Sequence, residues 1–347
     1  MLLTRICVND IILNSTLNVA VCLRHQITHI LHKVTLQMIN NEKNNSNNKS
    51  GMFKQKVRRF FMNLRQDANI LLELTRKSVK TQYRGSILGM FWTVLHPLLN
   101  MGVMWLVFSQ FFGRDDPAYP IYLLTGNILF TSLRAATDGA LGSVVANRGL
   151  LLRTKISSHL FPMASVTSAL VSLGFSFIAL LLIMIGTQIW GGLQLFGVQM
   201  LLVLAMLPAL LMFEIGIGLA LSAIYVYGRD IKHFYSVFLT LWMYLTPISY
   251  KPSTMLDANL AKTFAFKVVE CNPMYYFVQY FRDAVYYNHY TGQSIWQFTN
   301  KTGSAWLAPA MLTDVPMLLW LYFIGIISCA LGWGLFAILK RRFATHL

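Results

Sequence analysis

The chain has 347 residues, of which 55% are hydrophobic and only 12% are charged. Because a soluble domain carries about 25% charged residues, this composition is typical of a membrane protein and excludes an ordinary soluble enzyme. The net charge of +16 would suggest nucleic acid as the partner of a soluble protein. With this hydropathy it indicates a membrane surface instead, and we expect no nucleic-acid partner.

The first segment, 1–51, shows no pattern of a folded element. Polar residues interrupt its apolar stretches, so no signal-peptide core forms, and it ends in the Asn-rich run "NNEKNNSNNKSG". We expect a disordered or dispensable extension. His25, His29 and His32 follow Cys22 at helical spacing, which would suit a metal face. Because no carboxylate accompanies them, and because the four cysteines form no CxxC pair, we expect no metal site.

The next segment, 52–86, is amphipathic. Apolar residues recur every three or four positions from Phe53 to Leu72, and basic residues lie mainly between them. This pattern predicts a helix that lies in the membrane interface, with an ordinary soluble amphipathic helix as the alternative. The candidate anchors to the headgroups are Arg58, Arg59, Arg76 and Arg84. Gly85 and Ser86 then allow a sharp break between a helix that lies flat and one that stands upright.

The rest of the chain alternates long apolar segments with short polar ones. A helix needs about 20 apolar residues to cross a bilayer. Six segments meet this requirement, so the expected fold class is an all-α integral membrane protein with six transmembrane helices. The segments are Ile87–Phe112, Tyr119–Leu141, Leu160–Trp190, Val198–Val226, Ile231–Tyr250 and Val315–Leu339. The fifth is only just long enough and includes Pro247, and the second contains Arg134 and Asp138.

The basic residues determine the orientation. Before the first span there are 14 Lys and Arg against 4 Asp and Glu, and the even-numbered loops and the tail are also basic. The third loop is uncharged, and the fifth loop, 251–314, balances 5 basic against 4 acidic residues. By the positive-inside rule both termini lie in the cytoplasm. The fifth loop is too polar in places to span, so we expect one or two short re-entrant helices there, on the outer side and buried in protein.

Three stretches resemble a known family. "YRGSILGMFWTVLHPLL" is similar to the entry of the first span in the permease subunits of ABC type 2 exporters, which handle O-antigen, capsular polysaccharide and teichoic acid. "LALSAIYVYGRDIKHFYSVFLTLWMYLTPISY" (219–250) resembles the family's spans four and five, and "NPMYYFVQYFRDAVYY" (272–287) resembles its outer segment. The resemblance covers about residues 53–342. Departures at His96, Glu214, Tyr225 and Gly228 leave the substrate open.

The resemblance implies a non-catalytic transport subunit, with residues 87–347 as its transmembrane domain. No GxxxxGK[ST] loop occurs in the sequence, so ATP and Mg would be bound by a separate nucleotide-binding subunit. The family implies a homodimer within a two-plus-two complex of permeases and ATPases. It also implies a lipid-linked glycopolymer as substrate and the bacterial cytoplasmic membrane as location, with several spans.

The loop between spans two and three predicts a contact with the motor. Residues 144–160 are short, amphipathic and basic, which favours a coupling helix that docks on the ATPase and transmits its closure to the spans. A loop that only satisfies the positive-inside rule is the alternative. The candidate coupling residues, with two from the turn after span four, are Asn147, Arg148, Leu151, Arg153, Lys155, Arg229 and Asp230.

Aromatic residues predict the passage. Sugars present C–H faces that stack on aromatic rings, and the resemblance points to spans one and five as the channel lining. The candidates there are Trp92, Trp105, Phe108, Phe111, Trp242, Tyr244 and Tyr250. Rings that merely lie at the membrane interface are the alternative. For an outer gate the candidates are Tyr275, Tyr276, Tyr280 and Arg282, the last facing either the polymer's pyrophosphate or the neighbouring Asp283.

Other functions remain open. Within the same fold, a drug or lipid exporter is the first alternative. An ion-coupled secondary transporter would use intramembrane charges such as Glu214, but it would normally show inverted repeats, and we find no matching halves. A membrane enzyme would need a clustered acid–base set, which is absent, so we predict no catalytic residues.

Overall fold

The computed structural model describes residues 48–82, 84, 89, 91–112, 119–154, 156–191, 198–250, 268–269, 271–286, 315–341 and 343. All regular elements among these residues are helices, which confirms the all-α fold class. The described residues fall into two parts, which we describe separately. The first contains residues 48–69, 84 and 89. The second, which we call the helical body, contains residues 70–82 and all described residues from 91 onward.

Helix α2 (Asn48–Gln82) corresponds to the predicted amphipathic helix. Its residues 70–82 belong to the helical body. There it buries Thr75 and Val79 and exposes its charged residues. One weak pair joins two of them, with Arg76 Nη1 3.5 Å from Glu73 Oε1. An exposed pair of this kind contributes about 0–1 kcal/mol, so α2 keeps its cations available to other partners.

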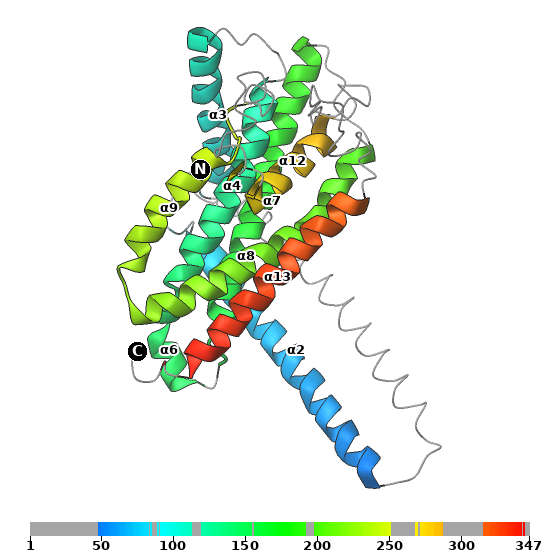
Figure 1. Cartoon of the computed structure of the whole chain (residues 1–347), viewed down its shortest axis with the longest axis vertical. Helices are drawn as coiled ribbons and strands as arrows, with labels where there is room; N and C mark the ends of the chain where they lie inside the picture. Colours follow the sequence, from blue (N-terminus) through cyan, green and yellow to red (C-terminus); the bar gives the residue numbers. More distant parts are fainter. Residues whose placement is uncertain are drawn as a thin grey trace, which may run out of the picture. The chain divides into compact units, whose positions relative to one another are not determined.

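The other helices of the body follow one another in alternating directions (Figure 1). They are α3 (Phe91–Phe112), α4 (Tyr119–Leu141), α5 (Ser143–Ala146), α6 (Arg148–Arg153), α7 (Leu160–Gly191), the 3₁₀ helix η1 (Val198–Leu201), α8 (Leu202–Tyr227), α9 (Ile231–Leu245), α12 (Pro273–Tyr286) and α13 (Val315–Lys340). Helix α4 packs on α7 and α8, and α8 packs on α13. We call the end of the body where α4 ends and α7 begins the α6 end. Helices α8 and α13 also end there, because Val226 and Phe336 pack in one cluster with Val144 of α5, and Tyr227 Oη donates a hydrogen bond of 2.7 Å to the Leu339 carbonyl.

The long helices agree closely with the predicted spans. Helix α4 has the predicted bounds, and α7 and α13 each extend one residue beyond them. Within the described part of the chain, three segments are long and apolar enough to cross a membrane: Leu160–Ile189, Leu202–Tyr227 and Met317–Lys340. A shorter apolar helix covers Phe91–Val107. The body is therefore an all-helical membrane domain.

The predicted fifth span is too long. Helix α9 has 15 residues and ends at Leu245 instead of Tyr250, so at 1.5 Å per residue it reaches about 22 Å, less than the roughly 30 Å of a hydrocarbon core. The cause is Pro247. Thr246 is extended (φ −87°, ψ 125°), as expected of a residue before proline, and the proline has no N–H to continue the helix. Helix α3 likewise begins at Phe91 rather than at Ile87.

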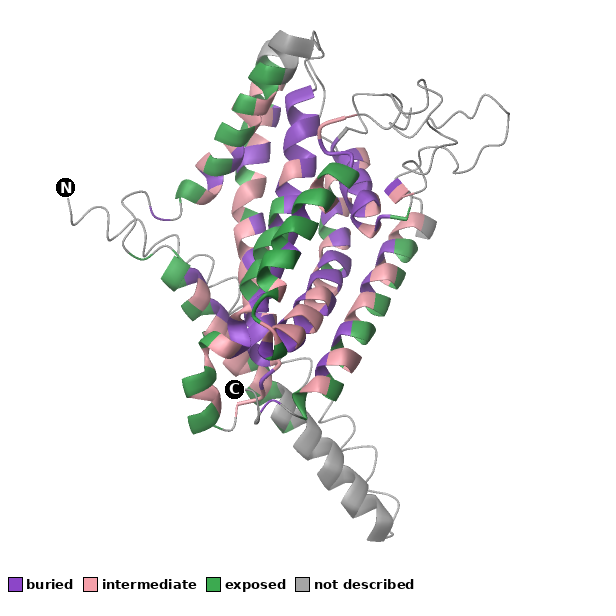
Figure 2. Ribbon diagram, turned by 60° about the vertical axis from the view of Figure 1, so that its left-hand side comes forward, coloured by how far each residue is buried: buried purple, intermediate pink, exposed green. Residues whose placement is uncertain are grey.

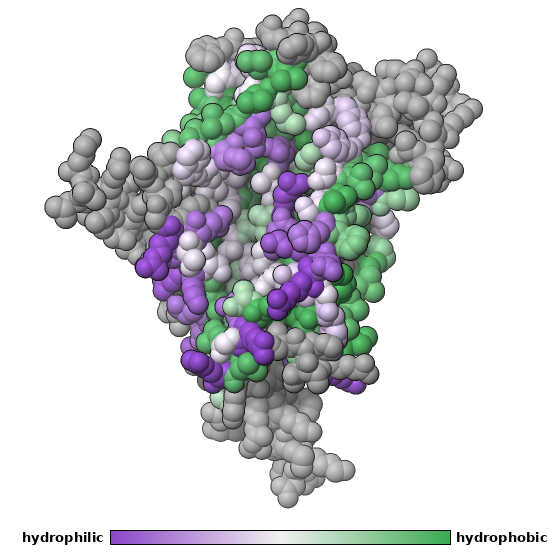
Figure 3. Space-filling model, turned by 90° about the vertical axis from the view of Figure 1, so that its left-hand side faces the viewer, coloured by the Kyte–Doolittle hydropathy of each residue, from purple (hydrophilic) through white to green (hydrophobic). Residues whose placement is uncertain are grey.

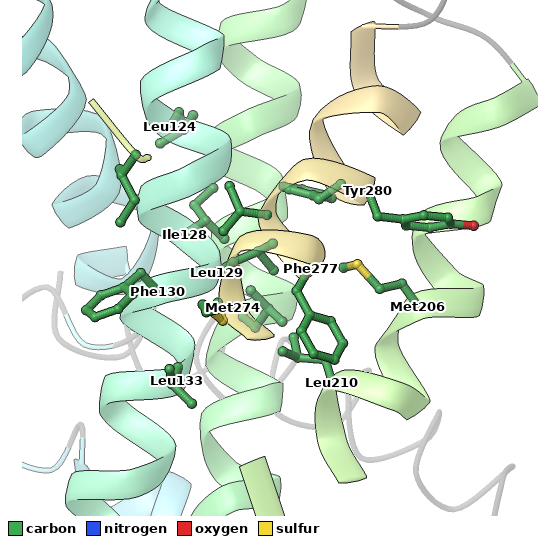
Figure 4. Packing of buried hydrophobic residues seen from close by; sticks show 14 of the residues in the cluster. Leu124, Ile128, Leu129, Phe130, Leu133, Met206, Leu210, Met274, Phe277 and Tyr280 are labelled. Atoms are coloured by element: carbon green, nitrogen blue, oxygen red, sulfur yellow. The ribbon is translucent and has the colours of Figure 1, made fainter. Parts of the chain in front are cut away.

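The core of the body lies where α12 meets α4 and α8 (Figure 4). Its central side chains are fully or almost fully buried. They are Leu124, Ile128, Leu129, Phe130 and Leu133 of α4, Met206 and Leu210 of α8, and Met274, Phe277 and Tyr280 of α12. Because lipid tails are as apolar as these side chains, close packing stabilises such a core in a membrane more than removal from water does. The packing fixes α12 against the long helices.

Helices α8 and α13 approach each other through glycines. A Cβ atom at Gly332 would overlap the backbone of Gly216, and a Cβ at Gly325 would lie 2.7 Å from the Ala209 carbonyl oxygen. Ser328 Oγ also donates a hydrogen bond of 3.0 Å to the carbonyl of Phe213. Small residues that let two backbones come close are the usual means of packing membrane helices.

Candidate functional site

The predicted coupling helix over 144–160 is two short helices, α5 and α6, which meet at Asn147. Asn147 has φ −102° and ψ 19°, outside the regular helical region, and its Nδ2 donates to the Ser143 carbonyl at 2.8 Å. Helix α6 ends because Thr154 is extended, with φ −127° and ψ 155°. The prediction of one continuous helix was therefore wrong in its bounds, since the side chain of Asn147 binds the preceding turn and interrupts the helix.

The candidate coupling residues lie at the α6 end of the body. Arg148 and Arg153 are exposed and Leu151 is half-buried, while Lys155 lies outside the described residues. Arg229 and Asp230 are exposed in the turn between α8 and α9, which is at the same end. The structure thus places two basic segments, distant in sequence, at one end of the helical body.

The aromatic candidates on α3 and α9 differ in exposure. Trp92 and Trp105 of α3 are 45% and 46% exposed, whereas the side chains of Phe108 and Phe111 lie outside the described residues. Tyr244 of α9 is exposed. In contrast, Trp242 and Tyr250 are half-buried.

Helix α9 presents a continuous exposed face (Figure 2). Only two of its side chains, Tyr235 and Leu239, are buried. The exposed apolar residues recur at helical spacing and are Phe234, Val237, Phe238, Leu241, Tyr244 and Leu245. This face has no covering element among the described residues of the chain.

Asn272 joins α9 to α12. Trp242 Nε1 donates to Asn272 Oδ1 at 2.7 Å, and Asn272 Nδ2 donates to Thr246 Oγ1 at 2.8 Å. The same Oδ1 accepts the backbone N–H of Met274 at 3.0 Å, so Asn272 caps α12, with Pro273 at the first helical position. Asn272 is not among the residues predicted from the sequence, although the Asn-Pro pair is a recognisable helix start.

Arg282 is fully buried and holds α12 in place. Its Nη1 donates to the Pro247 carbonyl at 2.6 Å, and its Nη2 donates to the carbonyls of Ile248 and Tyr122 at 2.9 and 3.1 Å. The guanidinium also lies 3.5 Å from the ring centroid of Tyr122, a cation–π contact. A Cβ at Gly126 would come within 2.7 Å of Nη2, so glycine is required beside it. In this conformation Arg282 binds the protein's own backbone.

The three tyrosines proposed for the gate all belong to helix α12. Tyr275 and Tyr280 are buried, with 2% and 3% exposure, and Tyr276 is half-buried. Two further tyrosines of α4 support the turn that Arg282 binds: Tyr119 Oη donates to the Ser249 carbonyl at 2.7 Å and Tyr122 Oη to that of Tyr250 at 2.8 Å. The turn after α9 and helix α12 are thus tied to α4 by polar contacts as well as by packing.

The charges within the long helices have different surroundings. Glu214 of α8 is fully buried and its Oε1 accepts a hydrogen bond of 3.0 Å from Ser132 Oγ of α4. Its Oε2 has no hydrogen-bond partner in the described part of the chain. Arg134 and Asp138 of α4 are exposed and form no ion pair with each other there. On the face shown in Figure 3, hydrophilic side chains lie between hydrophobic ones.

The predicted anchors of α2 fall in both parts of the structure. Arg76, in the helical body, and Arg84, in the first part, are exposed, whereas the side chains of Arg58 and Arg59 lie outside the described residues. Across the described ranges, no group of three or more His, Cys, Asp or Glu side chains is placed to hold a metal ion.

A family model described as ABC-2 type transporter matches residues 70–286. The chain is similar to the O-antigen export system permease protein RfbA of Myxococcus xanthus, with 28% identity over 233 residues that cover 67% of this chain and 85% of the relative. It is also similar to the protein of that name from Klebsiella pneumoniae, with 24% identity over 292 residues, 80% of this chain and 95% of the relative. These matches confirm the family resemblance of the three sequence stretches.

Proposed function

Because this chain belongs to the ABC-2 type transporter family, we propose that it is the permease subunit of an ATP-driven exporter of a lipid-linked cell-surface polysaccharide. The observation that supports this most is the similarity to O-antigen export permeases over 80% of the chain, since so long a match is independent of any single motif. The chain is a multi-pass membrane protein. Which polymer it moves, including a teichoic-acid-like one, is left open by this proposal.

The proposed topology has six membrane helices, α3, α4, α7, α8, α9 and α13, with both termini in the cytoplasm. The α6 end is then the cytoplasmic end. In support, the exposed residues there include Arg148, Arg153 and Arg229, as the positive-inside rule requires. The short helix α9 would cross with the help of the turn at 246–250, which α4 and Arg282 hold by hydrogen bonds.

The motor would bind at the α6 end. Helix α6, together with the turn at Arg229 and Asp230, presents exposed polar side chains, and α5 joins α6 to α4. Docked in a groove of a nucleotide-binding subunit, they would transmit its closure to α4, α7, α8 and α9, which these elements join. ATP and Mg would be bound by that partner, and the working unit would contain two copies of each subunit.

The passage would lie between two copies, lined by α3 and α9. Their exposed rings, including Trp92, Trp105 and Tyr244, could stack on the C–H faces of sugars without demanding one register, as a sliding polymer needs. Helix α12 would cover the outer exit, with the half-buried Tyr276 as its accessible ring. Arg282, engaged by three carbonyls, would hold this cover instead of contacting the polymer.

A drug or lipid exporter of the same fold is the second candidate. An ion-coupled transporter that uses Glu214 is less well supported. Its carboxylate is fully buried and accepts a hydrogen bond from Ser132, which favours a role in joining α4 to α8. A proton-coupling acid would need an alternating path to water on both sides.

The test is to express the full chain with its candidate nucleotide-binding subunit and to measure complex mass by light scattering and export of a lipid-linked oligosaccharide in proteoliposomes. We expect a two-plus-two complex. The pair Arg148→Glu and Arg153→Glu should dissociate the complex, whereas Lys267→Glu in the predicted outer loop should leave it intact. A permease that binds no ATPase and exports nothing would refute the proposal.

A further inference from the structure

A recess lined by both polar and apolar residues lies in the helical body between the last turns of α2, α4 and the first half of α7. Its volume is about 540 Å³, within the range of roughly 300–1,000 Å³ typical of small-molecule sites. The lining residues are Leu74, Lys77, Ser78, Thr81, Gln82, Ala135, Gly139, Asn147, Phe161, Ala164, Ser165, Ser168, Ala169 and Ser172. It is separate from the exposed faces of α3 and α9, none of whose residues lines it.

The lining offers hydrogen-bond donors and no carboxylate. On the α7 side, Ser165, Ser168 and Ser172 follow one face of the helix, and each hydroxyl donates to a carbonyl of the turn before it, at 3.3, 2.8 and 3.3 Å. Bonds of this kind are exchangeable, since a hydroxyl rotates to suit a better acceptor. On the α2 side, Lys77 is exposed and has no ion-pair partner among the described residues. An ammonium group facing several hydroxyls is a lining that suits a phosphate.

Helix α4 forms the floor of the recess with small residues. Ala135 and Gly139 line it, and a Cβ added at Gly139 would lie 3.4 Å from the Cβ of Ser165, so a larger residue would fill the space. Arg134, adjacent to Ala135 in the chain, is exposed but does not line the recess. Asp138, also exposed on α4, does not line it either.

We propose that this recess binds the phosphate or diphosphate of a membrane lipid, and that the lipid carrier of the exported polymer is its physiological ligand. This assignment rests on the proposed export of a lipid-linked polymer. An amphipathic helix such as α2 lies at the depth of the headgroups, so Lys77 would meet a lipid phosphate there without leaving the membrane surface. Binding in the recess would hold the carrier beside α4 and Asn147, next to the proposed coupling segment.

The binding test uses the full chain in nanodiscs of phosphatidylcholine, titrated with a fluorescent short-chain polyprenyl diphosphate. We expect Lys77→Gln to weaken binding about 10-fold, as loss of one charge-assisted hydrogen bond does, and Ser168→Leu, which fills the recess, to weaken it at least as much. Lys80→Gln is the matched control: Lys80 is exposed on the same helix but does not line the recess, so its affinity should stay within twofold of the wild type. Thermal midpoints verify that each variant is folded.

Competition distinguishes the possible sources of the phosphate. Displacement of the probe by phosphatidylglycerol at equal mole fraction would show that the recess accepts any anionic lipid. Displacement by inorganic diphosphate would show that the headgroup alone is sufficient for binding. Both results support a lipid-phosphate recess. Equal binding by the wild type, Lys77→Gln and Ser168→Leu would overturn it. If those variants also export normally with the ATPase, the recess assignment is wrong but the proposed export function is retained. A wild type that neither binds the ATPase nor exports would refute the proposed function itself.

Discussion

Two apolar regions of the body, the α8–α13 pair and α9, pack in opposite ways. Helices α8 and α13 bring their backbones together at Gly216, Gly325 and Gly332, where no Cβ atom fits. Helix α9 buries only Tyr235 and Leu239 and exposes large apolar and aromatic side chains along one face. Both are hydrophobic, so hydropathy alone does not distinguish them.

The difference indicates which helices are structural and which are available to a partner or a substrate. In a membrane, contact between helices depends on close packing and hydrogen bonds, because lipid covers any apolar face equally well. The α8–α13 contact is therefore a permanent part of the fold. Helix α9 is attached mainly at its end, through Trp242, Thr246 and Asn272, which leaves its aromatic face exposed.

The largest effect is expected from Gly332→Leu. A side chain at this position would overlap the backbone of Gly216, and the two helices would have to separate. We expect no monodisperse protein in fluorescence-detected size-exclusion chromatography. The matched control is Gly334→Leu on the same helix, where an added Cβ meets no atom within 4 Å, and its yield should equal that of the wild type. Normal yield of Gly332→Leu would show that the close approach is not required.

Arg282→Met should have the next largest effect. It removes a buried group that binds three carbonyls, and at about 1 kcal/mol or more for each carbonyl left unpaired, the free energy of unfolding should fall by roughly 3 kcal/mol. The measurement is the thermal midpoint in detergent together with the rate of proteolysis after residue 250. Arg341→Met, an exposed arginine, is the control. If Arg282 instead serves the polymer, export would fall while the midpoint stays unchanged.

Asn272→Ala should weaken the attachment of α9 to α12 while leaving the α8–α13 contact unchanged. Loss of a helix cap costs about 1–2 kcal/mol, and the bonds to Trp242 and Thr246 are lost with it. We expect faster amide hydrogen exchange over 231–246 and little change in α8 and α13. Gln188→Ala, exposed on α7, should change neither region. Equal protection of α9 in Asn272→Ala and the wild type would show that α9 is held by other contacts.

Tyr244→Ala should change stability least and still reduce transport. Its side chain is 68% exposed, so the thermal midpoint should stay within error of the wild type. Loss of one stacking contact of about 1 kcal/mol should slow export of a lipid-linked oligosaccharide roughly 5-fold. Leu331→Ala, which is 69% exposed on α13, is the control and should export normally. An unchanged rate in Tyr244→Ala would remove this ring from the proposed passage.

The helices could be predicted because the bilayer imposes their length and hydropathy. The bounds of α4 agree with those predicted from the sequence, because its long run of mostly apolar residues is local information. The bounds failed where a side chain or a proline competes with the helix. Asn147 divides the predicted coupling helix, and Pro247 ends α9 early.

The candidate site was only partly predictable. The basic segments at the α6 end and the aromatic residues of α3 and α9 could be predicted because they depend on local composition. Arg282 was predicted to belong to a gate because it lies in a tyrosine-rich segment. Its hydrogen-bond partners, Tyr122, Pro247 and Ile248, are 160, 35 and 34 residues away and could not be predicted from local sequence. The serines that line the recess recur along one face of α7. Their spacing does not predict that Lys77 of α2 lines the same recess.

The sequence by itself determined that this is a helical membrane protein of the ABC-2 type. Apolar segments of about 20 residues, as a bilayer helix requires, and the family motifs are both local properties of the chain. Only the tertiary structure decided which ionisable side chains are buried and which stay exposed. Arg282 and Glu214 are buried and hydrogen-bonded, whereas Lys77 and Arg134 are exposed. The physical reason is that satisfying a buried charge requires partners from other helices, and their identity depends on packing between segments far apart in the sequence.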